Sequence, residues 1–280
     1  MLASMKDTRH TSQEGYTMPI VVRARSFYLY DRYGVRYIDF FQNHGRAILG
    51  HRPELMQKAI KSTVSRGLVS EYPSVYEGRL EKLLAKLFPD YAGFRMYCNP
   101  AMVEKVAMMV STDVIYDPAY SPSEANCAVS YWRPYLEVGG ADSVLLFPIL
   151  PFPGSFIPQV VCIKDQALAD ELPPSDCVSP LLLDLLIKAT ASMIQSLNSD
   201  EMVAKRMNNP LSGLFKTRGP YGMTNLSESR YREFVQEALR LKVVLPPSPD
   251  VPFIVPGEYS KGDVEMFLKL AEQYAQPEVR

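Results

Sequence analysis

The sequence predicts an α/β fold, and three observations indicate it. Strand-like apolar runs alternate with helix-like segments through the middle of the 280-residue chain, as in proteins whose helices pack against a sheet. Residues 26–63 have the pattern of a β-hairpin followed by an amphipathic helix. From Ser199 onward, amphipathic helices are separated by short strand candidates. A chain of this length can bury a sizeable core, as one large domain or two modest ones.

The N-terminal segment is predicted to pack against a larger body. Two runs rich in strand-forming residues flank the turn Asp31-Arg32-Tyr33-Gly34, which predicts the hairpin. Breaks that contain glycine and histidine follow at residues 43–45 and 50–53. Beyond Pro53, apolar side chains recur at helical spacing as far as Val64. Because one face of this helix is apolar, the segment needs a surface to cover it.

The middle of the chain is predicted to supply that surface. Apolar periodicity predicts helices at 76–88, 102–110 and 180–197, with a helical turn at 165–171. Short apolar runs predict strands at 94–98, 143–150 and 160–163. Residues 112–143 and the proline-containing loop 151–158 are predicted to be irregular.

The C-terminal part is predicted to be α+β. Helices are expected at 200–207 and 227–241, and strands at 243–245 and 253–255. A final helix is expected from Ser260, because Ser260 and Asp263 have the spacing of a helix-start capping arrangement.

The charge balance argues against a nucleic-acid or membrane partner. Lys and Arg together number 30 and Asp and Glu 31, and no basic tract suggests a surface for nucleic acid or anionic lipid. The start of the chain lacks the apolar core of a signal peptide. No apolar run reaches the roughly 20 residues that a membrane-spanning helix needs.

The cysteines and histidines indicate a cytoplasmic protein without a metal site. The four cysteines lie far apart and form no Cys-x-x-Cys pair, so we expect reduced and mostly buried thiols. The three histidines do not have metal-ligand spacing. The residues concerned are Cys98, Cys127, Cys162, Cys177, His10, His44 and His51.

Two segments of the chain resemble one enzyme family. Residues that fit in register are Tyr28-Leu29, Asp31, Gly34, Arg36-Tyr37-Ile38-Asp39-Phe40, Gly45, Leu49-Gly50-His51 and Pro53. This order resembles the N-terminal segment of the class III (glutamate-1-semialdehyde aminomutase-like) pyridoxal-phosphate aminotransferases. Residues 243–249 and 260–265 resemble the closing segment of the same family, with Tyr259 where a histidine is usual.

The resemblance implies a reduced fold type I aminotransferase-like large domain and an α+β small domain built from both chain ends. Each strand–helix–strand crossover takes about 30 residues, so the middle has room for only three or four strands. We therefore expect an N-terminal arm at 1–18 and a shortened large α/β domain at 76–198. The small domain would consist of 19–75 and 199–280.

The cofactor-binding loop of the family is not matched. The resemblance places a phosphate loop between the strand at 94–98 and the helix that follows, where this chain has Cys98-Asn99-Pro100-Ala101-Met102. Proline has no N–H to donate, and alanine and methionine have no hydroxyl. Asn99 is the remaining candidate there. Ser175 matches a hydroxyl that reaches a neighbouring subunit's phosphate in this family, although a turn before a helix explains it equally well.

The catalytic lysine of the family is also not matched. One alignment of 151–161 puts Pro151 where the Schiff-base lysine would stand, and a second leaves out the lysine-bearing stretch. Both alignments remain open, and neither supplies a lysine. Lys164 is the nearest candidate, although a solvated lysine at the end of a strand is the simpler interpretation. No aspartate that would face the pyridinium nitrogen can be identified.

Other residues have both a functional and a structural interpretation. Arg218 is our candidate for binding a substrate carboxylate. His51 resembles a catalytic histidine, but a histidine bonded to backbone at a helix start is the simpler interpretation. Tyrosines of the hairpin could line a ligand or subunit surface, or simply pack within the half-buried hairpin. Acidic residues of 113–142 could pair as acid and base, although no spacing supports it. A Trp–Arg pair could cover a pocket or simply pack on a loop. These residues are Tyr28, Tyr30, Tyr33, Tyr37, Asp113, Asp117, Glu124, Asp142, Trp132 and Arg133.

The sequence therefore predicts an aminotransferase-like scaffold that has lost pyridoxal-phosphate catalysis and binds no cofactor. It would act as a homodimeric binding or structural subunit, holding a small acid or a partner enzyme. The alternative is an active aminotransferase or aminomutase that uses pyridoxal phosphate through Lys164 or Lys188. A third hypothesis is an enzyme of another class that reuses the cleft.

Overall fold

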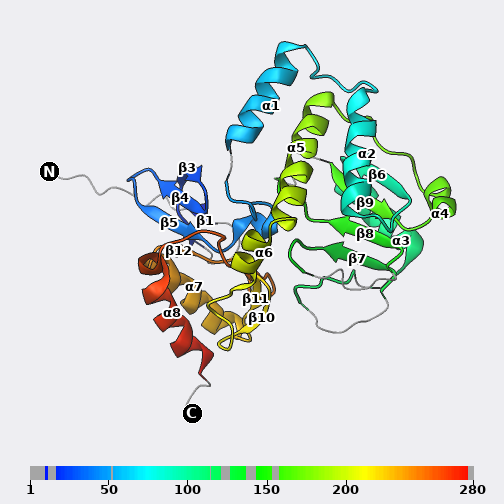
Figure 1. The fold of residues 1–280 in the computed structure, drawn as a ribbon. Helices are drawn as coiled ribbons and strands as arrows, with labels where there is room; N and C mark the ends of the chain where they lie inside the picture. Colours follow the sequence, from blue (N-terminus) through cyan, green and yellow to red (C-terminus); the bar gives the residue numbers. More distant parts are fainter. Residues whose placement is uncertain are drawn as a thin grey trace.

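In the computed structural model, the described residues are 10–11, 17–51, 53–113, 115–120, 127–136, 143–152 and 158–276. They form a sheet covered by helices on both faces and a second region in which both ends of the chain meet (Figure 1). Most of the expected arm at 1–18 lies outside the described residues, apart from the short pair β1 (His10–Thr11) and β2 (Thr17–Met18). Glu124 and Asp142 also lie outside them.

The larger sheet has four strands, in agreement with the expected three or four. They are β6 (Gly93–Tyr97), β7 (Val129–Trp132), β8 (Leu145–Pro148) and β9 (Gln159–Ile163), in the order β6-β9-β8-β7. β7 and β8 are parallel, and β9 is antiparallel to its neighbours β6 and β8. β7 corrects the prediction that 112–143 is irregular throughout. Its four residues pair with β8, with Val129 opposite Leu145. A strand this short has too few residues to show a strand pattern in the sequence.

Helices cover both faces of this sheet because its strands are apolar on both sides. These helices are α2 (Val75–Leu87), α3 (Pro100–Val110), α4 (Gln166–Glu171) and α5 (Pro180–Leu197). Leu146 and Cys162 pack with α2 and α5, whereas Leu145 and Val161 pack with α3 and α4. α1 (Pro53–Ser65) lies against α5.

α5 begins as the sequence indicates, with Ser179 accepting a hydrogen bond from the Leu182 amide and Pro180 at the first helical position. Within the described residues it is also the one helix whose length and mean hydropathy, 1.2, would allow it to cross a membrane. Half of that stretch is buried inside the protein, and α1 and α2 lie along it, as expected for a core helix.

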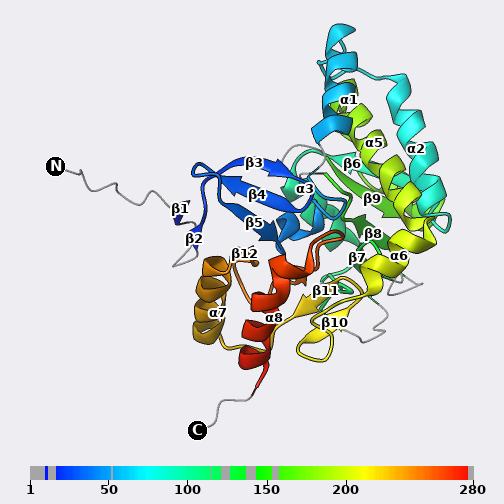
Figure 2. The same ribbon diagram turned by 60° about the vertical axis from the view of Figure 1, so that its left-hand side comes forward.

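The second region joins the two chain ends in one sheet. Its strands are β3 (Val21–Arg25), β4 (Tyr28–Asp31), β5 (Arg36–Asp39) and β12 (Val243–Val244), in the order β12-β5-β4-β3. The C-terminal β12 runs parallel to β5, with Val243 opposite Ile38. Helices α7 (Glu228–Arg240) and α8 (Lys261–Ala275) pack beside it, as the turned view in Figure 2 shows.

A third, small sheet contains the strand expected at 253–255 together with two strands that were not expected from the sequence. It consists of β10 (Lys216–Arg218), β11 (Tyr221–Met223) and β13 (Phe253–Ile254). α6 (Asp200–Met207) connects α5 to this sheet. β10 and β11 are three residues each, too short to produce a recognisable alternation. The prediction of an α/β fold is confirmed.

The expectation of mostly buried thiols is wrong. Cys98 and Cys177 are exposed, Cys127 is partly exposed, and Cys162 is buried.

Candidate functional site

Asp39 connects the two ends of the segment that carries the family-like pattern. Its buried carboxylate accepts hydrogen bonds from the Phe41 and Gln42 amides, each at 2.9 Å. Its second oxygen lies 3.0 Å from Nε2 of His51. The His51 amide donates to the Ser26 carbonyl at 2.6 Å. His51 thus bonds to backbone through its amide and to a carboxylate through its ring. We call residues 39–51 the Asp39–His51 loop.

The middle of this loop has a backbone conformation that L-amino acids rarely adopt. Four consecutive residues, Gln42 to Gly45, have φ values of 48°, 48°, 58° and 95°. Left-handed conformations of non-glycine residues cost on the order of 1–2 kcal/mol each. The Gln42 side chain stabilises the turn by donating to the Ile254 carbonyl at 2.8 Å. The turn places His44 and Arg46 beside the larger sheet.

Two arginines lie where the larger sheet faces this loop, Arg46 from the loop and Arg133 from the sheet. The carboxyl ends of β6, β7 and β8 meet the start of β9 there, since Tyr97 pairs with Gln159 and Trp132 with Pro148. Ligands of open α/β sheets bind outside such carboxyl ends. Arg46 donates to the Gln159 side chain at 3.0 Å. We call this region, which includes residues 97–102, 116–118 and 131–133, the sheet edge.

Arg133, the second arginine, is 5% exposed and held on both sides. It makes a two-pronged contact with Asp117, in which Nε and Nη2 each lie 2.6 Å from a carboxylate oxygen, and its Nη1 donates to the His44 carbonyl at 3.3 Å. Burial first, then the charges of Arg133 and Arg46, lower the pKa of His44. Asp117 therefore pairs with an arginine instead of acting as half of an acid–base pair.

Arg218 lies next to this arrangement. From β10 it donates to the Pro118 carbonyl, and its Nη1 is 3.5 Å from the Tyr116 hydroxyl. The residues on both sides of Asp117 are thus held by Arg218, and the structure brings two of the sequence candidates, Asp117 and Arg218, into one neighbourhood. Arg218 thus bonds to groups of the protein itself.

The expected phosphate position is filled by groups of the chain itself. The side chain of Asn99 accepts from the Ala101 amide at 3.0 Å and so caps its own helix, α3, with Pro100 at the first position. The Cys98 amide donates to Asp176 at 2.7 Å, which places a carboxylate where an anion would have to sit. Because the nearby donors are used and the added charge is negative, these residues do not fit a bound phosphate.

Ser175 also bonds within its own chain. Its hydroxyl accepts from the Met96 amide at 3.1 Å, and the Asp176 amide donates to the Met96 carbonyl at 2.9 Å. This contact ties the segment before α5 to β6.

Among the lysines of the described residues, neither of the two sequence candidates lies at the sheet edge. Lys216 of β10 donates to the Tyr120 carbonyl, just beyond the segment 116–118, at 3.3 Å. Each lysine of the described residues is exposed except Lys164, which is half-buried. Lys164 follows β9 at its carboxyl end, whereas the sheet edge holds the amino end of that strand. Lys188 is exposed on α5. The two lysine candidates from the sequence, Lys164 and Lys188, are therefore away from the sheet edge.

The remaining candidates have structural contacts. Trp132 is buried in β7 and meets Phe88 edge-on, with ring centroids 5.1 Å apart. The Tyr28 hydroxyl donates to Asp263 at 2.7 Å. Asp113 accepts from Ser111. The described residues contain no group of three or more His, Cys, Asp or Glu side chains that could hold a metal ion.

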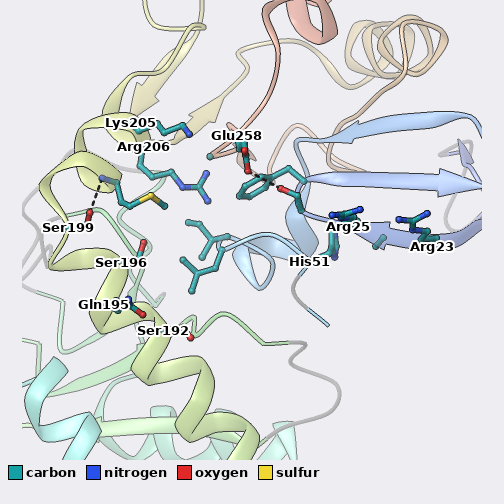
Figure 3. A pocket seen from close by; sticks show the side chains of 17 residues that line it. Arg23, Arg25, His51, Ser192, Gln195, Ser196, Ser199, Lys205, Arg206 and Glu258 are labelled. Carbon is teal, nitrogen blue, oxygen red and sulfur yellow. Dashed lines mark hydrogen bonds between the residues drawn. The ribbon is translucent and has the colours of Figure 1, made fainter. Parts of the chain in front are cut away.

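A cavity elsewhere in the protein was not found by sequence reasoning. It has a volume of about 900 Å³ and lies between β3, the Ile48–Leu49 segment, the end of α5, α6 and residues 257–258 (Figure 3). Its basic lining residues are Arg23, Arg25, Lys205 and Arg206. They come from two segments that are distant in the sequence. The only sign of the cavity in the sequence is that each segment carries two basic residues, at 23 and 25 and at 205 and 206.

The sequence comparisons include matches over most of the chain and matches over part of it. No protein-family model matches the chain. An uncharacterized protein of Borreliella burgdorferi is 26% identical over 256 residues, covering 90% of each chain. Glutamate-1-semialdehyde 2,1-aminomutase of Heliobacterium modesticaldum is 36% identical over 76 residues, which are 27% of this chain and 17% of the aminomutase. This chain is therefore the shorter of the two.

The structural comparisons give the fold. Plasmodium falciparum ornithine delta-aminotransferase has a TM-score of 0.69 at 13% identity, covering 91% of this chain and 92% of that chain. An omega-transaminase from Sphaerobacter thermophilus has a TM-score of 0.65 at 12% identity, with coverage of 95% and 94%. The chain thus has a reduced form of the fold type I architecture of class III pyridoxal-phosphate aminotransferases, with divergent sequence, and the resemblance stated above is confirmed.

Proposed function

We propose that this protein is an aminotransferase-like scaffold without pyridoxal-phosphate chemistry, which acts as a homodimeric binding or structural subunit. Its binding role would be to hold a small acid or a partner enzyme. The proposal separates what the fold supplies from what the cofactor needs. A Schiff-base lysine and a phosphate cradle are requirements of this chemistry, and neither follows from the architecture alone.

The observation that carries the proposal is the sheet edge. Pro100 has no N–H, Asn99 caps its own helix, and the Asp176 carboxylate occupies the Cys98 amide. A dianionic phosphate beside Asp176 would meet repulsion rather than donors. The half-buried Lys164 is at the far end of β9 from this position.

The test is whether the protein forms a Schiff base. Purified protein is mixed with pyridoxal phosphate, its visible absorption is recorded, and the mixture is reduced with borohydride and mapped by mass spectrometry. We expect no yellow species and no single modified lysine. Specific labelling of one lysine, abolished by Lys164→Ala or by Lys188→Ala, would establish the active-enzyme alternative instead.

The homodimer is supported by exposed apolar side chains on the part of the chain that projects from the body. α1 and the connection to α2 extend away from the sheets in both views. The side chains concerned, with exposed fractions of 37% to 69%, are Ile60, Val64, Val69, Tyr72 and Val75. Exposed apolar side chains gathered on one projecting segment are typical of a protein interface, and a second copy of the chain would cover them symmetrically.

Sedimentation velocity tests the dimer. We expect the protein to sediment as a dimer and Val64→Glu to shift it toward the monomer, because a buried unpaired charge is costly at an interface. Met266→Glu is the matched control, since Met266 is comparably exposed, at 58%, on α8. A wild-type protein that stays monomeric at high concentration would remove the dimer from the proposal, while leaving the cofactor result unaffected.

A further inference from the structure

The cavity beside α6 carries an excess of positive charge. Four cationic side chains line it, together with one carboxylate, that of Glu258. The chain as a whole has a net charge of −1, so this excess is local. A cleft that is lined by charges of one sign attracts small ions of the opposite sign. The cavity also has an apolar wall that includes Phe27, Ile48 and Leu49.

Arg206 is the one buried cation among the four. It is 2% exposed, and among the described residues no carboxylate forms an ion pair with it. Its Nη1 donates to the Val255 carbonyl at 2.7 Å, but its Nη2 has no hydrogen-bond partner within the described part of the chain. A buried charge is costly unless it is paired and hydrogen-bonded. In Figure 3 its side chain points toward the middle of the cavity-lining residues.

The surroundings of Arg206 hold its guanidinium in place. The group lies over the rings of Phe27 and Tyr135, at 4.8 and 5.5 Å from their centroids. A Cβ atom on Gly257 would come within 2.8 Å of its Cζ and Nε. Glycine at this position therefore leaves the space that the guanidinium fills. A fixed guanidinium is pre-organised for a planar oxyanion.

A second unusual feature borders the same cavity. Ser26 adopts φ 51° in the connection between β3 and β4. Its carbonyl is held by the His51 amide, and its hydroxyl lies 3.5 Å from Glu258. Strained residues of this kind gather at binding sites, where surrounding contacts maintain them.

We propose that this cavity binds a small organic anion, either a carboxylic acid or a phosphate monoester. The charged group would accept hydrogen bonds from Arg206, and an apolar body would lie against Phe27 and Leu49. Arg25 and Lys205, which are exposed at the cavity, would attract the anion and neutralise the rest of its charge. The volume of about 900 Å³ is in the range of small-molecule sites.

This inference gives a ligand class to the proposed binding role, and it does not depend on the loss of catalysis. None of its residues belongs to the sheet edge. The probes chosen below have no aldehyde and so cannot form a Schiff base, which keeps the two tests separate.

The experiment is calorimetric titration of the full-length protein with phenyl phosphate, benzoate and, as an uncharged control, benzyl alcohol. We expect one or both anions to bind in a salt-dependent manner and the alcohol not to bind. The phosphate and carboxylate arms distinguish the two ligand sources. Arg206→Met should weaken binding by about tenfold or more, because it removes charge-assisted hydrogen bonds. Arg25→Gln should weaken it by about threefold, since an exposed charge contributes less.

Two further variants keep the result interpretable. Arg232→Met removes the same charge from the exposed face of α7, where Arg232 pairs with Glu228, and should bind like the wild type. If Arg206→Met does not fold, Gly257→Ala retains the charge but displaces the guanidinium, and should also weaken binding by about tenfold. The proposal is overturned if neither anion binds the wild type, if benzyl alcohol binds equally well, or if Arg206→Met and Gly257→Ala both bind like the wild type.

Discussion

The Asp39–His51 loop and the sheet edge lie side by side, yet they relate to the aminotransferase pattern in opposite ways. In the loop, the residues that fit the pattern make the contacts that hold the chain in place: Asp39 binds two amides and His51. At the sheet edge, the residues do not fit the family's phosphate loop. The side chains of Asn99, Ser175 and Asp176 instead accept hydrogen bonds from backbone amides of the chain itself.

The difference teaches that the residues of the pattern that hold the backbone can be retained where the residues expected at the cofactor position are not. Gly50 shows why the loop is restrictive. It has φ +81°, and a Cβ atom there would lie 3.0 Å from the Ser26 carbonyl oxygen. Only glycine meets both conditions without strain. The sheet edge has no comparable requirement, because a helix cap and a proline form a sound helix start without any ligand.

The largest expected effect tests whether the loop is architectural. Gly50→Ala should lower the free energy of unfolding by about 2–4 kcal/mol, because left-handed strain adds to steric overlap with Ser26. Gly34→Ala is the matched control: Gly34 has φ +78° but no atom within 4 Å of the added Cβ, so strain alone predicts about 1 kcal/mol. Urea unfolding measures both. Equal losses in the two variants would contradict the role given to the Ser26 contact.

The parts of the fold that sequence reasoning found are those with a local cause. The hairpin turn at Asp31–Gly34, the proline at the start of α5 and the capping arrangement at Ser260 each follow from a few adjacent residues. β7, β10 and β11 were missed because they have only three or four residues each. β7 and β11 also depend on pairing with other segments, such as Tyr221 with Ile254.

The site was less predictable than the fold for the same reason. Arg218 and Asp117 were recognised as polar candidates, but their closeness depends on β10 meeting the segment 116–118. Arg206 follows Lys205 on a short amphipathic helix, where both would be expected to face solvent. Only the packing of Phe27 and Gly257 against it reveals that Arg206 is buried.

A smaller effect tests how the two chain ends are joined. Burial, then the hydrogen bond to Asp263, raises the pKa of Tyr28 to about 12. Because this folded-state pKa is above the ordinary value of 10, the associated stability is complete below pH 10 and is lost as the pH rises toward 12. Burial opposes the shift at Asp263, but hydrogen bonds from Tyr28 and Ser260 outweigh it and lower the pKa below 3.8. Its contribution is therefore present above pH 3.8 and is lost as the pH falls.

Tyr28→Phe should remove both effects. We expect a loss of about 1 kcal/mol at neutral pH, as for a hydrogen bond to a partly exposed charged group, and a flatter stability profile between pH 10 and 12. Urea unfolding across the pH range measures it. Tyr33→Phe, at a side chain that is 63% exposed, is the control and should keep the wild-type profile. An unchanged profile in Tyr28→Phe would show that this bond does not join the chain ends in solution.

The smallest effect tests whether burial and the two nearby arginines, Arg46 and Arg133, act on His44. Burial and these two cations lower the pKa of His44 below its ordinary 6.5, so the neutral imidazole is favoured in the folded protein. The associated stability is present above pH 6.5 and is lost as the pH falls below it. NMR titration should assign a pKa below 6.5 to the resonance that His44→Gln removes. Arg46→Gln should raise this pKa, whereas Arg36→Gln, at an exposed residue paired with Asp263, should leave it unchanged. If His44 instead titrates at or above 6.5, burial and the two arginines do not lower its pKa in solution. That result would contradict the position given to His44 between the loop and the sheet edge.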